Sequence, residues 1–555
     1  MTESFQSYAQ WLLPAVAYLI PVPVLLPAVA AALILLSGRK LALQRTIAFL
    51  TLLTLAFVAA SLLIVTTTYG IQTLQLGGWD APIGITLVAD RLSAIMLLVS
   101  AIVLFAVMWF GISQGLRDGN EDDPVAVFLP TYMLLTMGVN LAFLAGDLFN
   151  LYVGFEIFLV ASYVLLTLGA TASRVRAGIG YVMVSMASSM IFLIALALIY
   201  ASVGTVNMAH AGMRMEELPE GTRAAIFATL LVAFGIKAAA FPLDAWLPDS
   251  YPSAASLVTA VFAGLLTKVG VYAIIRTQFL LFPESALQNL IMGVGLMTMI
   301  VGILGAMAQP GIKRMLSFTL VSHIGYMLFG VGLANEAGLS AAIFYIAHHI
   351  TVQTALFLIT GLIERAGGST VIDRLGGLAA GAPVLAFLFF VPAMNLAGIP
   401  PFSGFIGKVG LIQAGVEDGS AMAWALVVAS VVTSLLTLYA IAKTWSYAFW
   451  RPRATEEHQT IDIPALTPSW GRLSDAIGAT VAAQRPATPI APPSAAVPVR
   501  REMPPAMFGG ATAVVAFSLG LSLFAGPLFT YTDAAAEQMI SRDAYVHAVL
   551  PEEVP

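Results

Sequence analysis

Charged residues and cysteines are what this sequence lacks. Only 10% of its 555 residues are charged, whereas 59% are hydrophobic; an average soluble domain has about 25% charged residues. A soluble protein needs charged side chains to solvate its surface, so this composition excludes an ordinary soluble domain and favours a chain surrounded by lipid. The absence of cysteine excludes disulfides, thiolate metal sites and iron–sulfur clusters.

The scarcity of basic residues excludes nucleic acid as a partner. The net charge is −5, and the lysines and arginines are scattered, so they form no basic stripe that could follow phosphates. We also expect no cofactor. Haem ligation would need two histidines facing each other across helices, and nothing in the sequence specifies that arrangement.

Long apolar runs fill most of the chain. A helix needs about 20 mostly apolar residues to cross the hydrocarbon core. Fourteen runs meet this requirement, at about 15–37, 46–68, 86–111, 125–145, 148–170, 178–204, 223–243, 256–278, 287–308, 315–334, 338–363, 383–414, 421–450 and 507–530. We therefore predict an all-α polytopic membrane protein with about 14 transmembrane helices. Residues 1–450 form the main bundle with spans 1–13, and 507–530 form the last span.

The distribution of basic residues predicts the orientation. If the N-terminus is external, sixteen lysines and arginines fall in cytoplasmic loops, five in external loops or at the external ends of runs, and the other four lie deeper within the runs. Cytoplasmic loops carry this excess in membrane proteins. We therefore place both termini outside the cell membrane of a prokaryote. Residues 451–506, with ten prolines from 452 onwards, form a Pro-rich cytoplasmic linker, and 531–555 form an external tail.

Two of the predicted spans contain helix breakers next to a lysine. In span 7, Pro242 follows Lys237, and in span 12 Pro400 and Pro401 precede Lys408. A broken helix within the membrane leaves backbone groups without intrahelical partners, and such breaks occur where polar cavities or ion routes are needed. We therefore predict broken helices at spans 7 and 12.

Ionisable side chains inside the predicted spans are the candidate functional residues. An ionised group near the bilayer centre costs a few kcal/mol, so each one needs a reason to be there. The primary candidates for proton translocation are Glu156, Lys237, Lys268, Lys408, His323 and His348. The secondary candidates are His349, Gln353, Asp147 and Asp244.

A carboxylate and several lysines on separate helices suit a proton route, because burial moves the pKa values of both groups towards neutrality. A pair of Glu156 and Lys237 could switch its charge state with its surroundings. Alternatively, the pair is a static ion pair that fixes helix register. The histidines are either relay groups or hydrogen-bonded packing residues. We expect His349 to point away from His348, its sequence neighbour, and Asp244 to lie at the cytoplasmic mouth.

Five segments resemble the antiporter-like membrane subunits shared by respiratory complex I and the Mrp-type multi-subunit Na⁺/H⁺ antiporters, and the Mrp type is nearest in pattern. The similarity covers about residues 20–450. It is carried by DLFNLYVGFEIFLVASYVLL (147–166), GIKAAAFPLDAWLPDSYPSAASL (235–257), LLTKVGVYAIIR (265–276), KRMLSFTLVSHIGYMLFG (313–330) and AGIPPFSGFIGK (397–408).

The resemblance implies roles for the buried groups. Glu156 and Lys237 would be the coupling pair, Lys268 the bridging lysine and Lys408 the terminal lysine of a second half-channel. Many relatives carry a lysine in span 11 where this chain has Gln353, and an amide cannot exchange a proton at accessible pH. The central relay would then run through His348, water or another side chain. The resemblance also implies two inverted five-helix repeats, spans 4–8 and 9–13.

Three functions are compatible with these observations. The first is a proton-translocating subunit that couples proton movement to Na⁺ export, with other integral membrane subunits as partners and lipid as its surroundings. The second is a proton-pumping membrane subunit of a complex I-like or hydrogenase-type redox complex. The third is a membrane scaffold. None of them makes the chain an enzyme in its own right, and no carboxylate cluster in the spans identifies a sodium site.

Overall fold

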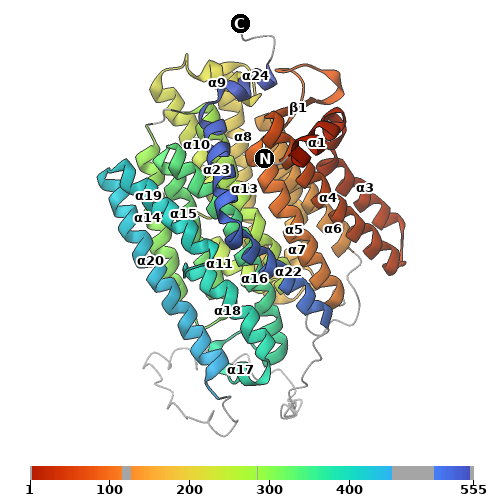
Figure 1. Cartoon of the computed structure of the whole chain (residues 1–555), viewed down its shortest axis with the longest axis vertical. Helices are drawn as coiled ribbons and strands as arrows, with labels where there is room; N and C mark the ends of the chain where they lie inside the picture. Colours follow the sequence, from red (N-terminus) through yellow and green to blue (C-terminus); the bar gives the residue numbers. More distant parts are fainter. Residues whose placement is uncertain (1–2, 115–126, 284–285, 453–504, 551–555) are drawn as a thin grey trace, which may run out of the picture.

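The computed structural model describes residues 3–114, 127–283, 286–452 and 505–550. The helices run side by side along one axis and form a single bundle (Figure 1). Nearly all of the predicted Pro-rich linker, residues 453–504, lies outside the described residues.

The first part of the chain forms helices and one small hairpin. Its elements are α1 (Glu3–Leu12), η1 (Leu13–Ala15), α2 (Val16–Leu19), α3 (Val22–Leu36), α4 (Leu41–Tyr69), β1 (Gln72–Gln75), η2 (Leu76–Gly78), β2 (Thr86–Ala89), α5 (Arg91–Gln114) and α6 (Phe128–Leu144).

The regular elements of the middle part are all helices. Its elements are α7 (Leu148–Thr167), α8 (Ala172–Val203), α9 (Met208–Met215), α10 (Glu220–Ala238), α11 (Trp246–Ser250), η3 (Tyr251–Ser253), α12 (Ser256–Val261), the π-helical η4 (Phe262–Leu266), α13 (Thr267–Leu281) and α14 (Gln288–Met307).

The last part completes the bundle. Its elements are α15 (Ile312–Leu333), α16 (Glu336–Gly367), η5 (Ile372–Arg374), α17 (Leu378–Gly381), α18 (Pro383–Ala397), α19 (Ser403–Asp418), α20 (Ala421–Trp445), the π-helical η6 (Ser446–Trp450), α22 (Pro505–Leu523), α23 (Ala525–Ile540) and α24 (Asp543–Val549).

The helices confirm a polytopic membrane protein. Within the described residues, eleven helices are long and apolar enough to cross a membrane, or twelve if the bent pair Tyr8–Leu19 and Val22–Leu36 is one span. Two shorter apolar helices, α6 and α18, accompany them. The count of fourteen spans remains a prediction.

A hairpin occupies the start of predicted span 3. Strands β1 and β2 pair antiparallel, with Gln72 opposite Ala89 and Gln75 opposite Thr86. The prediction that the third span begins at residue 86 is therefore wrong, and its helix begins at Arg91. The apolar residues of β2 are buried, which explains why they extend the hydrophobic run of the helix that follows.

Both predicted helix breaks are confirmed. Helix α10 ends at Ala238, with Ala239 in the left-handed conformation (φ 57°). Helix α18 ends at Ala397, and Gly398 takes the same conformation (φ 82°) before the proline pair. Proline has no N–H to continue the helical hydrogen bonding, so each helix stops before it.

Helix α16 lies at the centre of the fold. Its side chains are buried almost without exception from Gly338 to Ile363, and it packs against α5, α12, α15, α18, α19, α22 and α23. The predicted last span is two helices, α22 and α23, which meet at Phe524. The segment expected to be an external tail contains the end of α23 and all of α24, and α23 runs alongside the central helices (Figure 1, blue).

Candidate functional site

Lys237 and Glu156 lie near each other without forming an ion pair. Lys237 is buried in the last turn of α10, where its Nζ donates to Ser189 Oγ of α8 at 3.1 Å and lies 4.9 Å from the centre of the Phe155 ring. Glu156 is half-buried on α7, and its charge acts on Lys237. Among the described residues, no ion pair joins the two, and Glu156 Oε1 has no hydrogen-bond partner. The expected coupling pair is therefore separated in this structure.

Lys268 takes its partner from an irregular turn of its own span. The π-helical segment η4 precedes α13, and the Lys268 Nζ donates to the carbonyl of Ala263 at 2.5 Å. A π-turn removes one carbonyl from the regular hydrogen-bond ladder and makes it available to a side chain. Helices α10 and α13 approach closely beside the two lysines, because a Cβ on Gly270 would lie 2.7 Å from the backbone nitrogen of Ala238.

Lys408 caps the broken span 12. Its Nζ donates to the carbonyls of Leu396 and Ala397, both at 3.2 Å, where α18 ends. The unpaired carbonyls at a helix C-terminus carry partial negative charge, so a buried cation is stabilised there. Nζ also lies 4.9 Å from the centre of the Tyr326 ring, which adds a cation–π contact.

Two histidines and a tyrosine link α15 to α16. His323 Nδ1 and the Tyr345 hydroxyl share a hydrogen bond of 2.7 Å. The ring of His348 lies 5.3 Å from that of Tyr345, and its Nδ1 shares a hydrogen bond of 2.9 Å with Ser403 Oγ on α19. The Nε2 atoms of both histidines are buried without a hydrogen-bond partner among the described residues. The structure therefore brings His323, His348 and Lys408 into one region.

His349 belongs to the same cluster. Its ring centre lies 5.0 Å from that of His323 and 6.3 Å from that of Tyr345. Pointing away from His348 does not remove His349 from the cluster: α15 covers one side of α16 and α19 another, so successive residues both meet neighbouring helices. Lys268 lies close enough to interact electrostatically with His323 and His349.

Gln353 ties α16 to α15. Its Nε2 donates to the carbonyl of Leu316 at 2.7 Å, and its Oε1 has no partner among the described residues. The side chain is fully buried one turn beyond His349. It contributes a fixed amide dipole to the interface between α16 and α15.

The two candidate aspartates lie outside the helices. Asp147 is the N-cap of α7 and accepts from Asn150 N at 2.6 Å. Burial raises the pKa of Asp147 to about 6 despite that hydrogen bond. Asp244 follows the break after α10, and burial raises its pKa as well. Both carboxyls hold protons at higher pH than a solvent-exposed aspartate does.

One buried ion pair has no signal in the sequence. Arg276 of α13 pairs with both carboxylate oxygens of Asp90, and both residues are almost completely buried. Tyr545 of α24 and Met539 of α23 cover the guanidinium. The charge distribution places Arg276 in an external loop, because it stands at the end of an apolar run. The C-terminal helices that cover it are far away in the sequence.

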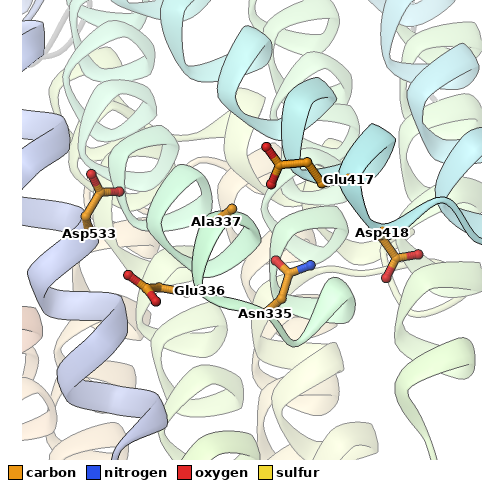
Figure 2. A pocket seen from close by; sticks show the side chains of 6 residues that line it. All are labelled: Asn335, Glu336, Ala337, Glu417, Asp418 and Asp533. Carbon is orange, nitrogen blue, oxygen red and sulfur yellow. The ribbon is translucent and has the colours of Figure 1, made fainter.

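An acidic cavity of about 410 Å³ lies at one end of the bundle. Its lining comes from the start of α16, the end of α19 and the middle of α23 (Figure 2), and comprises Asn335, Glu336, Ala337, Glu417, Asp418 and Asp533. The acids come from three elements, so no single run of sequence indicates them. Among the described residues, no group of three or more histidines or acids is placed to hold a metal ion.

Residues 145–437 match the model of the NADH:quinone oxidoreductase/Mrp antiporter membrane family. The chain belongs to this family. The match spans the elements from α7 to α20, which contain all the lysines and histidines described above. The resemblance to the antiporter-like subunits is thereby confirmed.

Curated relatives within the family are similar over most of the chain. The D subunit of a Na⁺/H⁺ antiporter from Alkalihalophilus pseudofirmus is 36% identical over 538 residues, which cover 96% of this chain and 99% of the relative. The corresponding D subunit from Bacillus subtilis is 36% identical over 436 residues, which cover 77% of this chain and 86% of the relative.

Solved structures of the family share the fold. A chain of the Mrp complex from a Dietzia species superposes with a TM-score of 0.82 at 32% identity and covers 96% of this chain and 99% of its own length. A chain of respiratory complex I from Thermus thermophilus gives a TM-score of 0.72 at 23% identity, covering 94% of this chain and all of the other. The second likeness shows the fold alone.

Proposed function

We propose that this chain is the proton-translocating subunit of a multi-subunit cation/proton antiporter and that it couples proton movement to Na⁺ export. Relatives named as D subunits of Na⁺/H⁺ antiporters are similar over most of its length. The observation that carries the proposal is the set of buried lysines and histidines on α10, α13, α15, α16 and α19, each bonded to a neutral oxygen or, among the described residues, to no partner. These groups can change protonation state without breaking an ion pair.

The proposed route runs from Glu156 through Lys237 to Lys268, and then through the histidine cluster to Lys408. The approach of α10 to α13 at Gly270 supports the first part. The electrostatic reach of Lys268 to His323 and His349 supports the second. Because Gln353 is an amide, protons would pass it through the histidines or through water.

The proposal includes a topology for the chain in a prokaryotic plasma membrane. It has fourteen crossings, both termini outside and residues 451–506 in the cytoplasm. Spans 4–8 and 9–13 form two inverted repeats. In both broken spans a side chain donates to a carbonyl at the helix end, and this similarity supports the repeats. Trp246 Nε1 donates to the carbonyl of Ile236 at the end of α10, and Lys408 Nζ donates to the carbonyl of Leu396 at the end of α18. Other integral membrane subunits, Na⁺, protons and lipid are the proposed partners.

Charge-removing substitutions test the proton route. In the assembled complex, Glu156→Gln and Lys237→Ala should each lower sodium-dependent proton exchange at least tenfold, because each removes a group that carries the charge. The measurement is the sodium-induced collapse of a pH gradient in inverted membrane vesicles. Lys443→Ala is the matched control, since Lys443 is half-buried on α20 and only donates to Met307 O at 3.4 Å.

Three outcomes would contradict the proposal. Unchanged exchange in both variants would show that protons do not pass through Glu156 and Lys237. If the variants lose exchange only because the complex fails to assemble, and exchange recovers fully once assembly is restored, the chain is a scaffold. Copurification with flavin or iron–sulfur proteins, rather than with small hydrophobic subunits, would assign the chain to a redox-driven proton pump instead.

A further inference from the structure

Polar side chains from three elements meet where span 12 is broken. Asn395 lies near the end of α18, Ser403 is the first residue of α19, and Ser518 and Ser522 lie one turn apart on α22. Asn395 Nδ2 donates to Ser518 Oγ at 2.8 Å, and the backbone N–H of Ser403 donates to Ser522 Oγ at 2.8 Å. Residues four apart share a helix face, so both serines bond to the break from the same side.

This network ends on a proposed relay group. Ser403 Oγ lies 2.9 Å from His348 Nδ1, and Asn395, Ser403 and His348 are all fully buried. Gly404 lets α19 begin this close to α16, because a Cβ there would lie 2.9 Å from the His348 ring. Buried polar groups are costly unless they are bonded, so the position of His348 depends on partners that are themselves held in place.

The amide of Asn395 has a fixed orientation. Its Oδ1 accepts the backbone N–H of Gly404 at 2.8 Å, while its Nδ2 faces Ser518. Ser403 Oγ lies 3.3 Å from Nδ2 and 3.4 Å from Oδ1. The serine hydroxyl therefore has both a donor and an acceptor within reach on one amide.

This arrangement satisfies His348 with or without a proton on Nδ1. A hydroxyl has one proton and two lone pairs. When Nδ1 is bare, Ser403 donates to it and accepts from Asn395 Nδ2. When Nδ1 carries a proton, it donates to Ser403 Oγ, and the hydroxyl proton turns to Asn395 Oδ1. Rotation of one hydroxyl covers both states, and no heavy atom has to move.

We propose that α22 is part of the ion-coupling machinery, with Ser518 and Ser522 acting as positioning residues that hold Asn395 and Ser403 in the arrangement serving both states of His348. The inference rests on the proposed function, because it assumes that His348 exchanges protons. It adds α22, which comes after residues 453–504 in the chain, to a site that is otherwise built from α15, α16, α18 and α19.

The charges around His348 bear on any pH measurement. Lys408 on α19, His323 on α15 and His349 on α16 itself interact with it electrostatically. From α18 and α22, the network presents only the neutral Asn395, Ser518 and Ser522. Substitutions on α22 therefore change hydrogen bonds around His348 without changing any charge near it.

Ser518→Ala in the assembled complex is the main test. Without its acceptor on α22, the Asn395 amide can turn, and losing one hydrogen bond corresponds to about a fivefold loss of the productive arrangement. We expect exchange per assembled complex to fall about fivefold and its pH profile to shift. Ser518→Thr, which keeps a hydroxyl, should restore both. Thr512→Ala, at an exposed site on the same helix, should change neither.

A double-mutant cycle separates positioning from mere packing. In a His348→Gln background, Ser518→Ala should cause no further change in the pH profile, because the group it positions is gone. Ser522→Ala, at a half-buried site, gives a second reading if Ser518→Ala fails to assemble. A wild-type pH profile in an assembled Ser518→Ala or Ser522→Ala complex would overturn this inference alone. Absence of sodium-dependent exchange in the unmodified complex would overturn the proposed function.

Discussion

Four of the buried cations, Lys237, Lys268, Lys408 and Arg276, are stabilised by different kinds of oxygen. Lys237 donates to a serine hydroxyl, Lys268 to a carbonyl of a π-turn, and Lys408 to two carbonyls at a helix end, whereas Arg276 has a carboxylate. A carboxylate partner keeps a cation charged, because neutralising either ion leaves the other buried without a counterion. Neutral oxygens stabilise a cation and also tolerate its neutral form. The lysines are therefore suited to exchange protons, and Arg276 is suited to hold structure.

Breaking the Asp90–Arg276 pair should destabilise the protein strongly. Arg276→Met leaves Asp90 buried without its counterion, which costs about 3–5 kcal/mol. The thermal midpoint of the purified complex measures the loss. Combining Asp90→Leu with Arg276→Met removes both charges and should recover much of the stability. The matched control is Asp249→Asn, because its pair with Arg314 is exposed and contributes at most about 1 kcal/mol. An equal loss in Arg276→Met and the control would contradict the structural role.

At the scale of elements, Lys237, Lys268 and Lys408 lie on three interrupted spans. Two interruptions, after Ala238 and after Ala397, leave helix-end carbonyls that a side chain can reach. The third, the π-helical η4, frees a carbonyl for Lys268 while the span continues. Regular helices would leave no free backbone acceptor at these depths. The irregular turns therefore supply the oxygens for Lys268 and Lys408, whereas Lys237 takes its oxygen from Ser189 of α8.

Gly264→Ala should displace the π-helical segment. A Cβ at this position would lie 2.3 Å from Thr354 Oγ1 on α16, and overpacking of this kind costs about 1–3 kcal/mol. Thr354 is short and bonded to its own helix, so it cannot move aside. The thermal midpoint of the complex should fall, and adding Thr354→Ala should restore part of it. No recovery in the double variant would show that the contact with Thr354 is not the cause.

The sequence predicts the proline breaks and the buried lysines Lys237, Lys268 and Lys408 because both are local features. Proline forces a helix to stop wherever it stands, and a lysine in an apolar run is conspicuous by itself. The π-turn at η4 has no such signal, since Phe262–Leu266 is an ordinary apolar stretch. The hydrogen-bond partners of the buried polar residues also have no signal in the sequence. Ser189 and Ser518 are common small residues, and only the packing of distant helices shows that they bond to Lys237 and Asn395.

At the scale of the whole molecule, the C-terminal helices complete the bundle. Helices α22 and α23 pack against α5 and α16. Tyr531 donates to the carbonyl of Arg91, and Gln538 accepts from its backbone N–H. Arg542 pairs with Glu216 at the end of α9. The C-terminal helices therefore contact α5 from the first part of the chain, α9 from the middle part and the central helix α16.

Ending the chain at residue 504 should prevent assembly. Without α22 and α23, buried side chains of α16 and the Asp90–Arg276 pair lose their cover, and lipid cannot satisfy the polar ones. We expect the truncated chain to be missing from the complex on native gels, and coexpression of 505–555 as a separate peptide to restore it. Deleting 465–490 instead, which keeps α22 to α24, is the control. Normal assembly of the truncated chain would contradict this role.

The central position of α16 has a consequence for how the protein is made. Residue 367 ends α16, and α22 begins about 140 residues later. At roughly 5–20 residues per second, α16 waits on the order of 10 s after its own synthesis before its last partners leave the ribosome. During this interval its polar residues have no neighbours on that side. The membrane insertion machinery must therefore hold an incomplete bundle until translation ends, and the final helices close it.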